Sequence, residues 1–134
     1  MLISEIANSC GLTVETLRYY DSIGLLTPKR INNIRNYTDA DRNKLKIIVA
    51  MKNMKFSLKE IKKIMKFDDL ITKDLDEDKL NQENCENLLQ EIKNKLAFIK
   101  KQEEDLMLIK SKLNKIIMKI NNLMDGGNYE FTDS

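Results

Sequence analysis

The chain has 134 residues, of which 42% are hydrophobic and 33% are charged, so it has room for one domain or for a small domain followed by an extended helix. No apolar run approaches the length that crosses a bilayer and no secretory signal pattern begins the sequence, so we expect a cytoplasmic protein with no membrane partner. The sequence contains no histidine, and Cys10 and Cys85 match neither a disulfide framework nor a zinc-finger spacing, which argues against an enzyme, a bound metal and any other cofactor.

The net charge of +2 hides an asymmetry between the two halves of the chain. Residues 1–67 hold 13 Lys or Arg and 6 Asp or Glu, a net charge of +7, whereas residues 68–134 hold 10 and 15, a net charge of −5. A basic half is expected of a surface that binds phosphates, and an acidic half would be repelled by the same duplex. We therefore expect one end of the chain to bind nucleic acid and the other end to serve a different partner.

The first two predicted helices are separated by a short turn. Ser4 is the expected N-cap of the first helix, and Gly11 is expected to end it in the left-handed conformation. Thr13 is the expected cap of the second helix, on which Arg18 and Tyr19 project away from the apolar side. Two helices joined by a short Gly-containing turn form a helix-turn-helix, whose second helix enters the major groove of DNA.

A basic hairpin is predicted to follow within residues 25–38. Its turn is Asn32-Asn33, because Asn tolerates a positive φ better than most residues. A helix-turn-helix followed by a basic wing indicates double-stranded DNA as the partner.

Two more helices complete the first domain. Thr38 begins a capping box in which Asp41 replaces the usual Glu, and its helix is expected to run to about Met54. Ser57 begins a regular capping box for the next helix. We therefore expect residues 1–67 to form a mainly α domain of four helices and a small β wing.

The second half is predicted to be an acidic connector or a fraying helix start at residues 68–81, a long helix at 82–124 and a short tail at 125–134. Apolar residues recur along the helix with the alternating 4/3 spacing of a coiled-coil seam, broken at Glu103. A lone helix of this kind exposes its seam to water, so we expect it to pair with a second chain. The seam consists of Ile92, Leu96, Ile99, Leu106, Ile109, Leu113, Ile116, Ile120 and Leu123.

Together these features resemble the MerR family of bacterial transcription regulators. The resemblance lies in the segments Ile3–Ala7, Gly11–Asp21, Gly24–Leu26, Arg35, Tyr37 and Phe56–Ile61, and in the architecture of the coiled coil. At the wing tip the chain has Asn33-Ile34, where the family commonly has Gly-Tyr.

The resemblance implies a short-form regulator, without a large effector domain, that forms a homodimer through an antiparallel coiled coil. Each winged helix would occupy half of a palindromic operator between the two promoter elements. The dimer would distort the spacer DNA so that RNA polymerase engages both elements, usually in response to an effector such as a small molecule. The effector, the operator sequence and the choice between activation and repression are not encoded in any motif of the chain.

The residues expected to contact DNA are Thr13, Thr16, Arg18, Tyr19, Tyr20, Lys29, Arg30, Arg35 and Tyr37. Arg18 is expected to reach a base edge or a phosphate in the major groove. Its alternative role is a surface ion pair with Glu15 or Asp21. Tyr20 is expected mainly to support the wing from the core side, and Tyr37 has packing at the base of the wing as its alternative role.

Cys85 lies near the start of the long helix, and its thiol is the one group there that could sense oxidants or electrophiles. Its alternative role is that of a small apolar residue at the helix junction. A single thiolate without histidine is a poor ligand set for a soft metal, so no metal site is expected.

Three other interpretations of the sequence are alternatives to a transcription regulator. An architectural or excisionase-like protein that bends DNA without a switch shares such a headpiece but rarely needs a long dimer helix. A purely structural coiled-coil adaptor leaves the basic first half unexplained. The chain is also compatible with the front of a longer regulator, whose ligand domain would begin after Gly126-Gly127.

Overall fold

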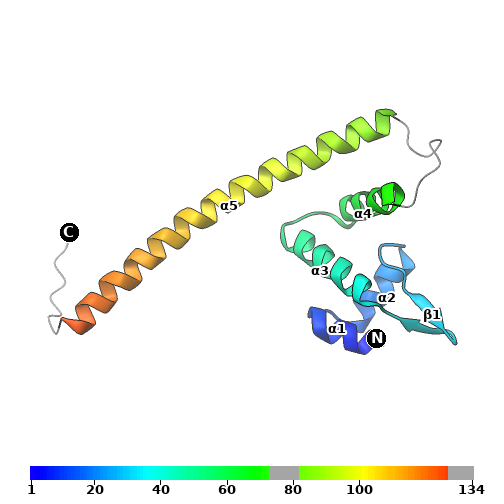
Figure 1. The fold of residues 1–134 in the computed structure, drawn as a ribbon, viewed down its shortest axis with the longest axis horizontal. Coiled ribbons are helices and arrows are strands. Elements are labelled where there is room, and N and C mark those ends of the chain that lie inside the picture. The colour runs from blue at the N-terminus through cyan, green and yellow to red at the C-terminus, as the bar shows by residue number, and fades with distance from the viewer. Residues whose placement is uncertain (73–81, 127–134) are drawn as a thin grey trace. The chain divides into compact units, whose positions relative to one another are not determined.

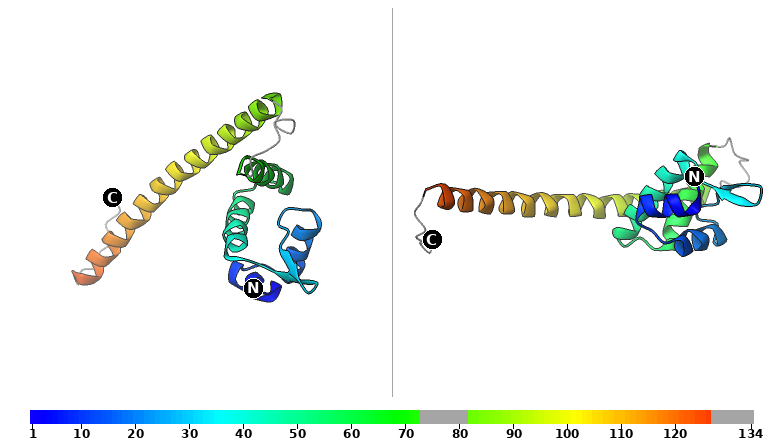
Figure 2. Two further views of the ribbon diagram at one scale, coloured as in Figure 1. Left: turned by 45° about the vertical axis from the view of Figure 1, so that its right-hand side comes forward. Right: turned by 90° about the horizontal axis from the view of Figure 1, so that it is seen from below.

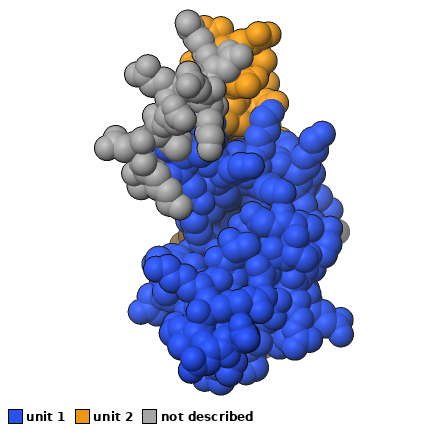
Figure 3. All heavy atoms as spheres, turned by 90° about the vertical axis from the view of Figure 1, so that its right-hand side faces the viewer, with its two compact units in different colours: residues 1–80 blue, residues 81–134 orange. Residues whose placement is uncertain are grey.

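The computed structural model describes residues 1–72 and 82–126, which belong to two compact units, unit 1 (residues 1–80) and unit 2 (residues 81–134) (Figure 3). In chain order the elements are α1 (Ile3–Cys10), α2 (Val14–Ser22), β1 (Lys29–Ile31), β2 (Ile34–Asn36), α3 (Asp39–Asn53), α4 (Leu58–Thr72) and α5 (Gln82–Asp125) (Figure 1). The expected fold class is confirmed: the described chain is mainly helical, with a winged helix-turn-helix followed by a long helix.

The turn between α1 and α2 is built by two residues. Gly11 takes the left-handed conformation with φ +67°, and the Leu12 N–H donates to the Ala7 carbonyl at 2.9 Å, which satisfies a carbonyl at the end of α1. Thr13 then starts α2, because its Oγ1 accepts the Thr16 N–H at 3.1 Å. Both roles agree with the sequence prediction.

The predicted N-cap of α1 is wrong. Leu2 occupies the cap position in an extended conformation, makes no side-chain cap and accepts the Glu5 and Ile6 N–H groups with its carbonyl. Ser4 therefore lies inside the first turn of α1, where its hydroxyl is not placed to cap the helix.

The wing is a tight antiparallel hairpin that projects from the helices of unit 1 (Figure 2). Its two-residue turn is Asn32-Asn33, with φ of +52° and +63°. Positive φ at both turn positions is the requirement of a type I′ hairpin, and Asn meets it without glycine. The absence of the family's Gly at this position therefore leaves the hairpin geometry intact.

Helices α3 and α4 both begin at capping boxes. The Thr38 Oγ1 accepts the Asp41 N–H at 3.1 Å, and the Asp41 carboxylate accepts the Thr38 N–H at 3.0 Å. Ser57 and Glu60 make the same pair of bonds, each at 3.1 Å. These caps set the starts of the helices that complete the core of unit 1, whose most deeply buried side chains are Ile6, Leu17, Tyr37, Leu45, Ile48 and Ile61.

Helix α4 runs five residues beyond the predicted end of the first domain. Residues 68–72, assigned from sequence to an acidic connector, continue α4 to Thr72. Asp69 is held by the Lys44 ammonium of α3, with N–O distances of 2.8 and 3.0 Å. This largely exposed ion pair joins α3 to α4 and contributes little free energy by itself. The rest of the connector, residues 73–81, lies outside the described residues.

Helix α5 is a single helix of 44 residues, which at 1.5 Å per residue is about 66 Å long. Its surface carries local pairs such as Lys101–Asp105, with an N–O distance of 3.3 Å. Such i,i+4 pairs stabilise a helix only slightly, so packing against another surface must supply most of its stability. Of the predicted tail, Asp125 belongs to α5 and residues 127–134 lie outside the described residues.

Candidate nucleic-acid interface

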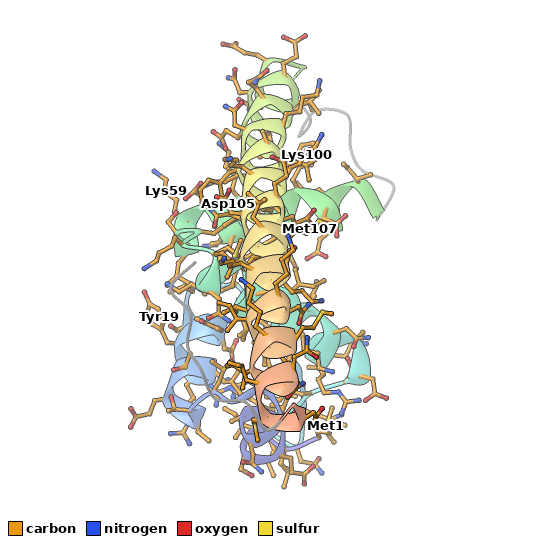
Figure 4. All side chains as sticks on the ribbon, turned by 90° about the vertical axis from the view of Figure 1, so that its left-hand side faces the viewer. Met1, Tyr19, Lys59, Lys100, Asp105 and Met107 are labelled. Atoms are coloured by element: carbon orange, nitrogen blue, oxygen red, sulfur yellow. The ribbon has the colours of Figure 1, made fainter. Side chains whose placement is uncertain are left out.

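The outer face of α2 presents two neighbouring residues of the predicted recognition helix. Arg18 is exposed, and Tyr19 is 52% exposed and projects from the surface of unit 1 (Figure 4). Leu17 and Tyr20, on either side of this pair in sequence, are buried. The helical period thus turns Arg18 and Tyr19 outward while their neighbours pack inward.

Arg18 makes no ion pair among the described residues. The two acids proposed from sequence as its alternative partners are Glu15 and Asp21, and Asp21 instead faces the wing. The guanidinium of Arg18 therefore keeps its donors available, and its planar fork suits a phosphate or the edge of a guanine.

Thr13 and Thr16 lie together at the start of α2. Their hydroxyl oxygens are 2.8 Å apart, and Thr13 is exposed. The Thr13 Oγ1 is already engaged in capping, so its main role is structural. Thr16 is half-buried, and its hydroxyl is occupied by Thr13. Any contact of this pair with a phosphate is therefore secondary to the capping role.

The wing carries three basic residues on two short strands. Strand β1 contributes Lys29 and Arg30 and strand β2 contributes Arg35, with Arg30 directly opposite Arg35 in the antiparallel register. Lys29 and Arg30 are exposed. Arg35 is half-buried, because its Nε–H donates to the Asp21 carboxylate at 2.7 Å.

Two of the predicted contact residues are core residues instead. Tyr20 is 6% exposed and Tyr37 is 1% exposed. Burial raises the pKa of both hydroxyls above the ordinary value of 10.0, and at Tyr37 the Arg35 guanidinium lowers the pKa in opposition to the burial. Both rings therefore pack in the core of unit 1, and the Tyr37 hydroxyl itself is buried, so packing accounts for the position of both residues.

The Tyr37 backbone also anchors the end of the wing. Its N–H donates to the Met1 carbonyl at 2.8 Å, which ties the residue after β2 to the segment before α1. The Tyr37 hydroxyl is buried with no hydrogen-bond partner among the described residues. The ring therefore contributes apolar packing rather than a polar contact.

Unit 2 exposes the predicted seam. Seven of its nine residues have large exposed apolar side chains: Ile92, Leu96, Leu106, Ile109, Leu113, Ile116 and Ile120. The other two, Ile99 and Leu123, are half-buried. The same helix also exposes Met107, Leu108, Ile117 and Met118, so the seam is distinguished by its heptad spacing and not by apolar exposure alone.

The described residues contain no group of three or more His, Cys, Asp or Glu side chains arranged for a metal ion. Cys10 and Cys85 are both free thiols and both half-buried. In the same part of the chain no helix has the length and apolar character needed to span a bilayer.

Sequence reasoning missed the role of Asp21. The structure brings Asp21 of α2 to both wing arginines, with its Oδ2 2.7 Å from Arg35 Nε and 3.6 Å from Arg30 Nη2. The predicted two-residue turn could have indicated this role, because it places Arg30 directly opposite Arg35 in the hairpin. Two like charges in that position repel each other and favour a neighbouring acid.

A family described as MerR HTH family regulatory protein matches residues 1–68, which is half of the chain. The HTH-type transcriptional regulator ZntR homolog of Haemophilus influenzae is 40% identical over 67 residues, covering 48% of this chain and 50% of that protein. The HTH-type transcriptional activator TipA of Streptomyces coelicolor is 38% identical over 61 residues, covering 44% of this chain and 24% of that protein. The chain thus spans about half of the first relative and a smaller part of the second.

Among solved structures, a Listeria monocytogenes protein assigned to the MerR family of transcriptional regulators has a TM-score of 0.50 and 20% identity, covering 91% of this chain and 84% of that one. At this identity the likeness concerns the fold alone.

Proposed function

The chain belongs to the MerR family of helix-turn-helix regulatory proteins, and from that premise we propose that it binds a palindromic promoter operator as a homodimer and distorts the spacer DNA to control transcription. The observation that carries the proposal is the exposed Arg18–Tyr19 pair on α2, beside a basic two-stranded wing. The expectation that the protein is not an enzyme agrees with its relatives, which are transcriptional regulators.

Within the proposed complex, α2 enters the major groove and the wing lies against the phosphate backbone. Arg18 contacts a base edge or phosphate, and Tyr19 donates its hydroxyl to a phosphate. Lys29, Arg30 and the free amino groups of Arg35 hold the backbone from the wing. The charge of +7 on residues 1–67 supports this assignment, because phosphate contacts supply most of the affinity.

We propose that α5 supplies the dimer contact. Its exposed seam is the surface that a second copy of the same helix would cover, and the family resemblance implies an antiparallel pair. The proposed symmetry of the dimer matches that of a palindromic site.

Distortion of the operator is energetically reasonable for such a dimer. Smooth bending of a site of 20–30 bp costs on the order of 1–6 kcal/mol, which the phosphate contacts of two basic headpieces can offset. An effector that changes the geometry of the headpieces would then switch transcription by RNA polymerase. Cys85 is a candidate sensor of such an effector, and the basis for this is its free, half-buried thiol near the start of α5.

The direct test is operator binding by an Arg18→Ala variant. A good bidentate arginine contact is worth about 1–3 kcal/mol, and a dimer has two, so affinity should fall at least about thirtyfold. Lys46→Ala is the matched control, because it removes one exposed positive charge from a residue of α3 that is not assigned a DNA contact. The recognition-helix assignment is wrong if Arg18→Ala binds like the wild type, or if both variants lose affinity equally while remaining dimeric.

A DNase I footprint on the DNA upstream of the gene separates the regulator from the architectural alternative. A protected palindrome between the two promoter elements, with enhanced cleavage at its centre, would support a regulator that distorts the spacer. Protection spread along the DNA without a boundary would favour an architectural DNA-bending protein.

A further inference from the structure

Asp21 joins the recognition helix to both strands of the wing. It lies near the C-terminal end of α2, and its side chain is 15% exposed. One oxygen, Oδ2, accepts the Arg35 Nε–H at 2.7 Å and lies 3.6 Å from Arg30 Nη2. A single carboxylate oxygen thus interacts with one arginine from each strand.

The wing depends on such a contact because it is too small to hold its own position. Each strand has three residues, and an isolated two-stranded hairpin is marginally stable at best. Arg30 and Arg35 also face each other directly across the strands, and like charges in that position repel. Asp21 offsets this repulsion and attaches the hairpin to α2 at the same point.

The contact leaves Arg35 available for a second partner. Its Nε–H is used by Asp21, while its two terminal amino groups have no partner among the described residues. A guanidinium presents five N–H donors in a planar fork, so fixing the Nε edge also fixes the direction of the remaining donors. Arg18 lies three residues before Asp21 on the same helix, a rise of about 4.5 Å.

We propose that Asp21 is a positioning residue for DNA recognition: it holds the wing at a fixed place relative to α2, so that Arg18 in the major groove and the wing on the phosphate backbone engage the operator together. The proposal deepens the proposed function and rests on it. Asp21 itself touches no DNA, because its carboxylate faces the two arginines and would repel a phosphate.

The positioning role makes a prediction opposite in sign to simple electrostatics. Removal of an acid from a surface that binds DNA should tighten binding, because it raises the net positive charge. If Asp21 positions the wing, its removal should weaken binding instead, since the arginines repel each other and lose their fixed orientation.

The experiment compares Asp21→Asn with Glu15→Gln in the full chain, by fluorescence anisotropy on an operator fragment at several salt concentrations. Both variants remove one negative charge from α2, but Glu15 is exposed in the first turn of the helix, at the opposite end from Asp21. We expect Asp21→Asn to bind at least tenfold more weakly and Glu15→Gln to bind as well as the wild type or more tightly. Equal or tighter binding by Asp21→Asn would overturn the proposal.

A hydroxyl-radical footprint separates positioning from general damage to the fold. Lys29→Ala identifies the protected positions that depend on the wing. Asp21→Asn should lose protection at those positions and retain it where α2 binds, whereas loss of all protection together would indicate unfolding and count against the proposal. Asp21→Glu, which keeps the carboxylate, should recover part of the affinity.

Arg35→Lys gives an independent variant in case Asp21→Asn folds poorly. It keeps the positive charge but loses the fork that Asp21 orients, so it should also bind at least tenfold more weakly. Wild-type affinity in Arg35→Lys would overturn the positioning role while leaving the proposed function intact. Absence of operator binding by the wild type would overturn the proposed function as well.

Discussion

Truncation of Leu113 on α5 should weaken the homodimer by an amount that follows from its exposure. In the single chain Leu113 is 54% exposed, and its heptad neighbours Leu106 and Ile120 are similarly open. Full burial of a leucine side chain is worth about 1.5–3 kcal/mol, so covering the exposed half contributes about 1 kcal/mol. A symmetric dimer contains two copies, and Leu113→Ala should therefore remove about 2 kcal/mol of association free energy.

That loss corresponds to a rise of about thirtyfold in the dimer dissociation constant, because 1.4 kcal/mol is a factor of ten. Adding Leu106→Ala should bring the loss to about 4 kcal/mol, or roughly a thousandfold, if the two sites act independently. Sedimentation equilibrium over a range of protein concentrations measures both constants. The fraction of helix should be followed by circular dichroism in the same samples, since unpaired α5 is expected to fray.

Leu108→Ala is the control for this experiment. Leu108 is more exposed, at 70%, but it lies two residues from Leu106 and so points away from the seam. The substitution makes the same chemical change on the same helix and should leave the dissociation constant unchanged. If Leu108→Ala weakens the dimer as much as Leu113→Ala does, or if the wild type is monomeric at micromolar concentration, the seam assignment is wrong.

Five further predictions concern unit 1. Gly11→Ala should destabilise the fold by about 1–2 kcal/mol in urea unfolding, because φ is +67° and an added Cβ meets no atom within 4 Å, so the cost is backbone strain alone; an unchanged midpoint would contradict this. Thr38→Ala should cost about 1 kcal/mol in the same assay through loss of its capping box, and an unchanged unfolding midpoint would contradict this. Tyr37→Phe should retain both stability and operator affinity, because the hydroxyl has no partner among the described residues; weaker binding would restore Tyr37 as a contact residue. Burial raises the Tyr37 pKa in the folded state above 10.0, so the folded protein keeps this hydroxyl protonated more strongly than the unfolded chain does. The free energy of unfolding is therefore undiminished below pH 10 and falls as the pH rises through the folded pKa. Tyr37→Phe should reduce this loss of stability at alkaline pH. Operator affinity should also fall steeply between low and physiological salt, and a flat salt response would count against the basic interface.

Local sequence signals predicted most element boundaries in unit 1. The caps at Thr13, Thr38 and Ser57, the left-handed Gly11 and the Asn32-Asn33 turn each depend on hydrogen bonds or dihedral angles within a few residues. Such signals are readable from sequence because the partner groups are close along the chain. The repeat along α5 is equally local, since its period is a property of one helix.

The predictions that failed all concerned positions where a local signal met a competing contact. Ser4 has the chemistry of an N-cap, but the extended Leu2 starts α1 two residues earlier. Residues 68–72 were assigned to the acidic connector, yet they continue α4, where Asp69 pairs with Lys44 of α3, 25 residues before it. A one-dimensional pattern carries no information about a partner so distant in sequence.

The sequence by itself thus determined the winged helix-turn-helix, its basic charge and the apolar row on α5, because composition, caps and periodicity are properties of short segments. Only the tertiary structure decided how the aromatic and charged residues of the wing divide their roles. Tyr37 matches the pattern of a contact residue but is buried beneath the hairpin, and Asp21 appears to be one more surface acid until the fold brings Arg30 and Arg35 to it. These roles depend on contacts of the wing with α2, such as the ion pairs of Asp21 with Arg30 and Arg35, which lie 9 and 14 positions later in the chain and in other elements.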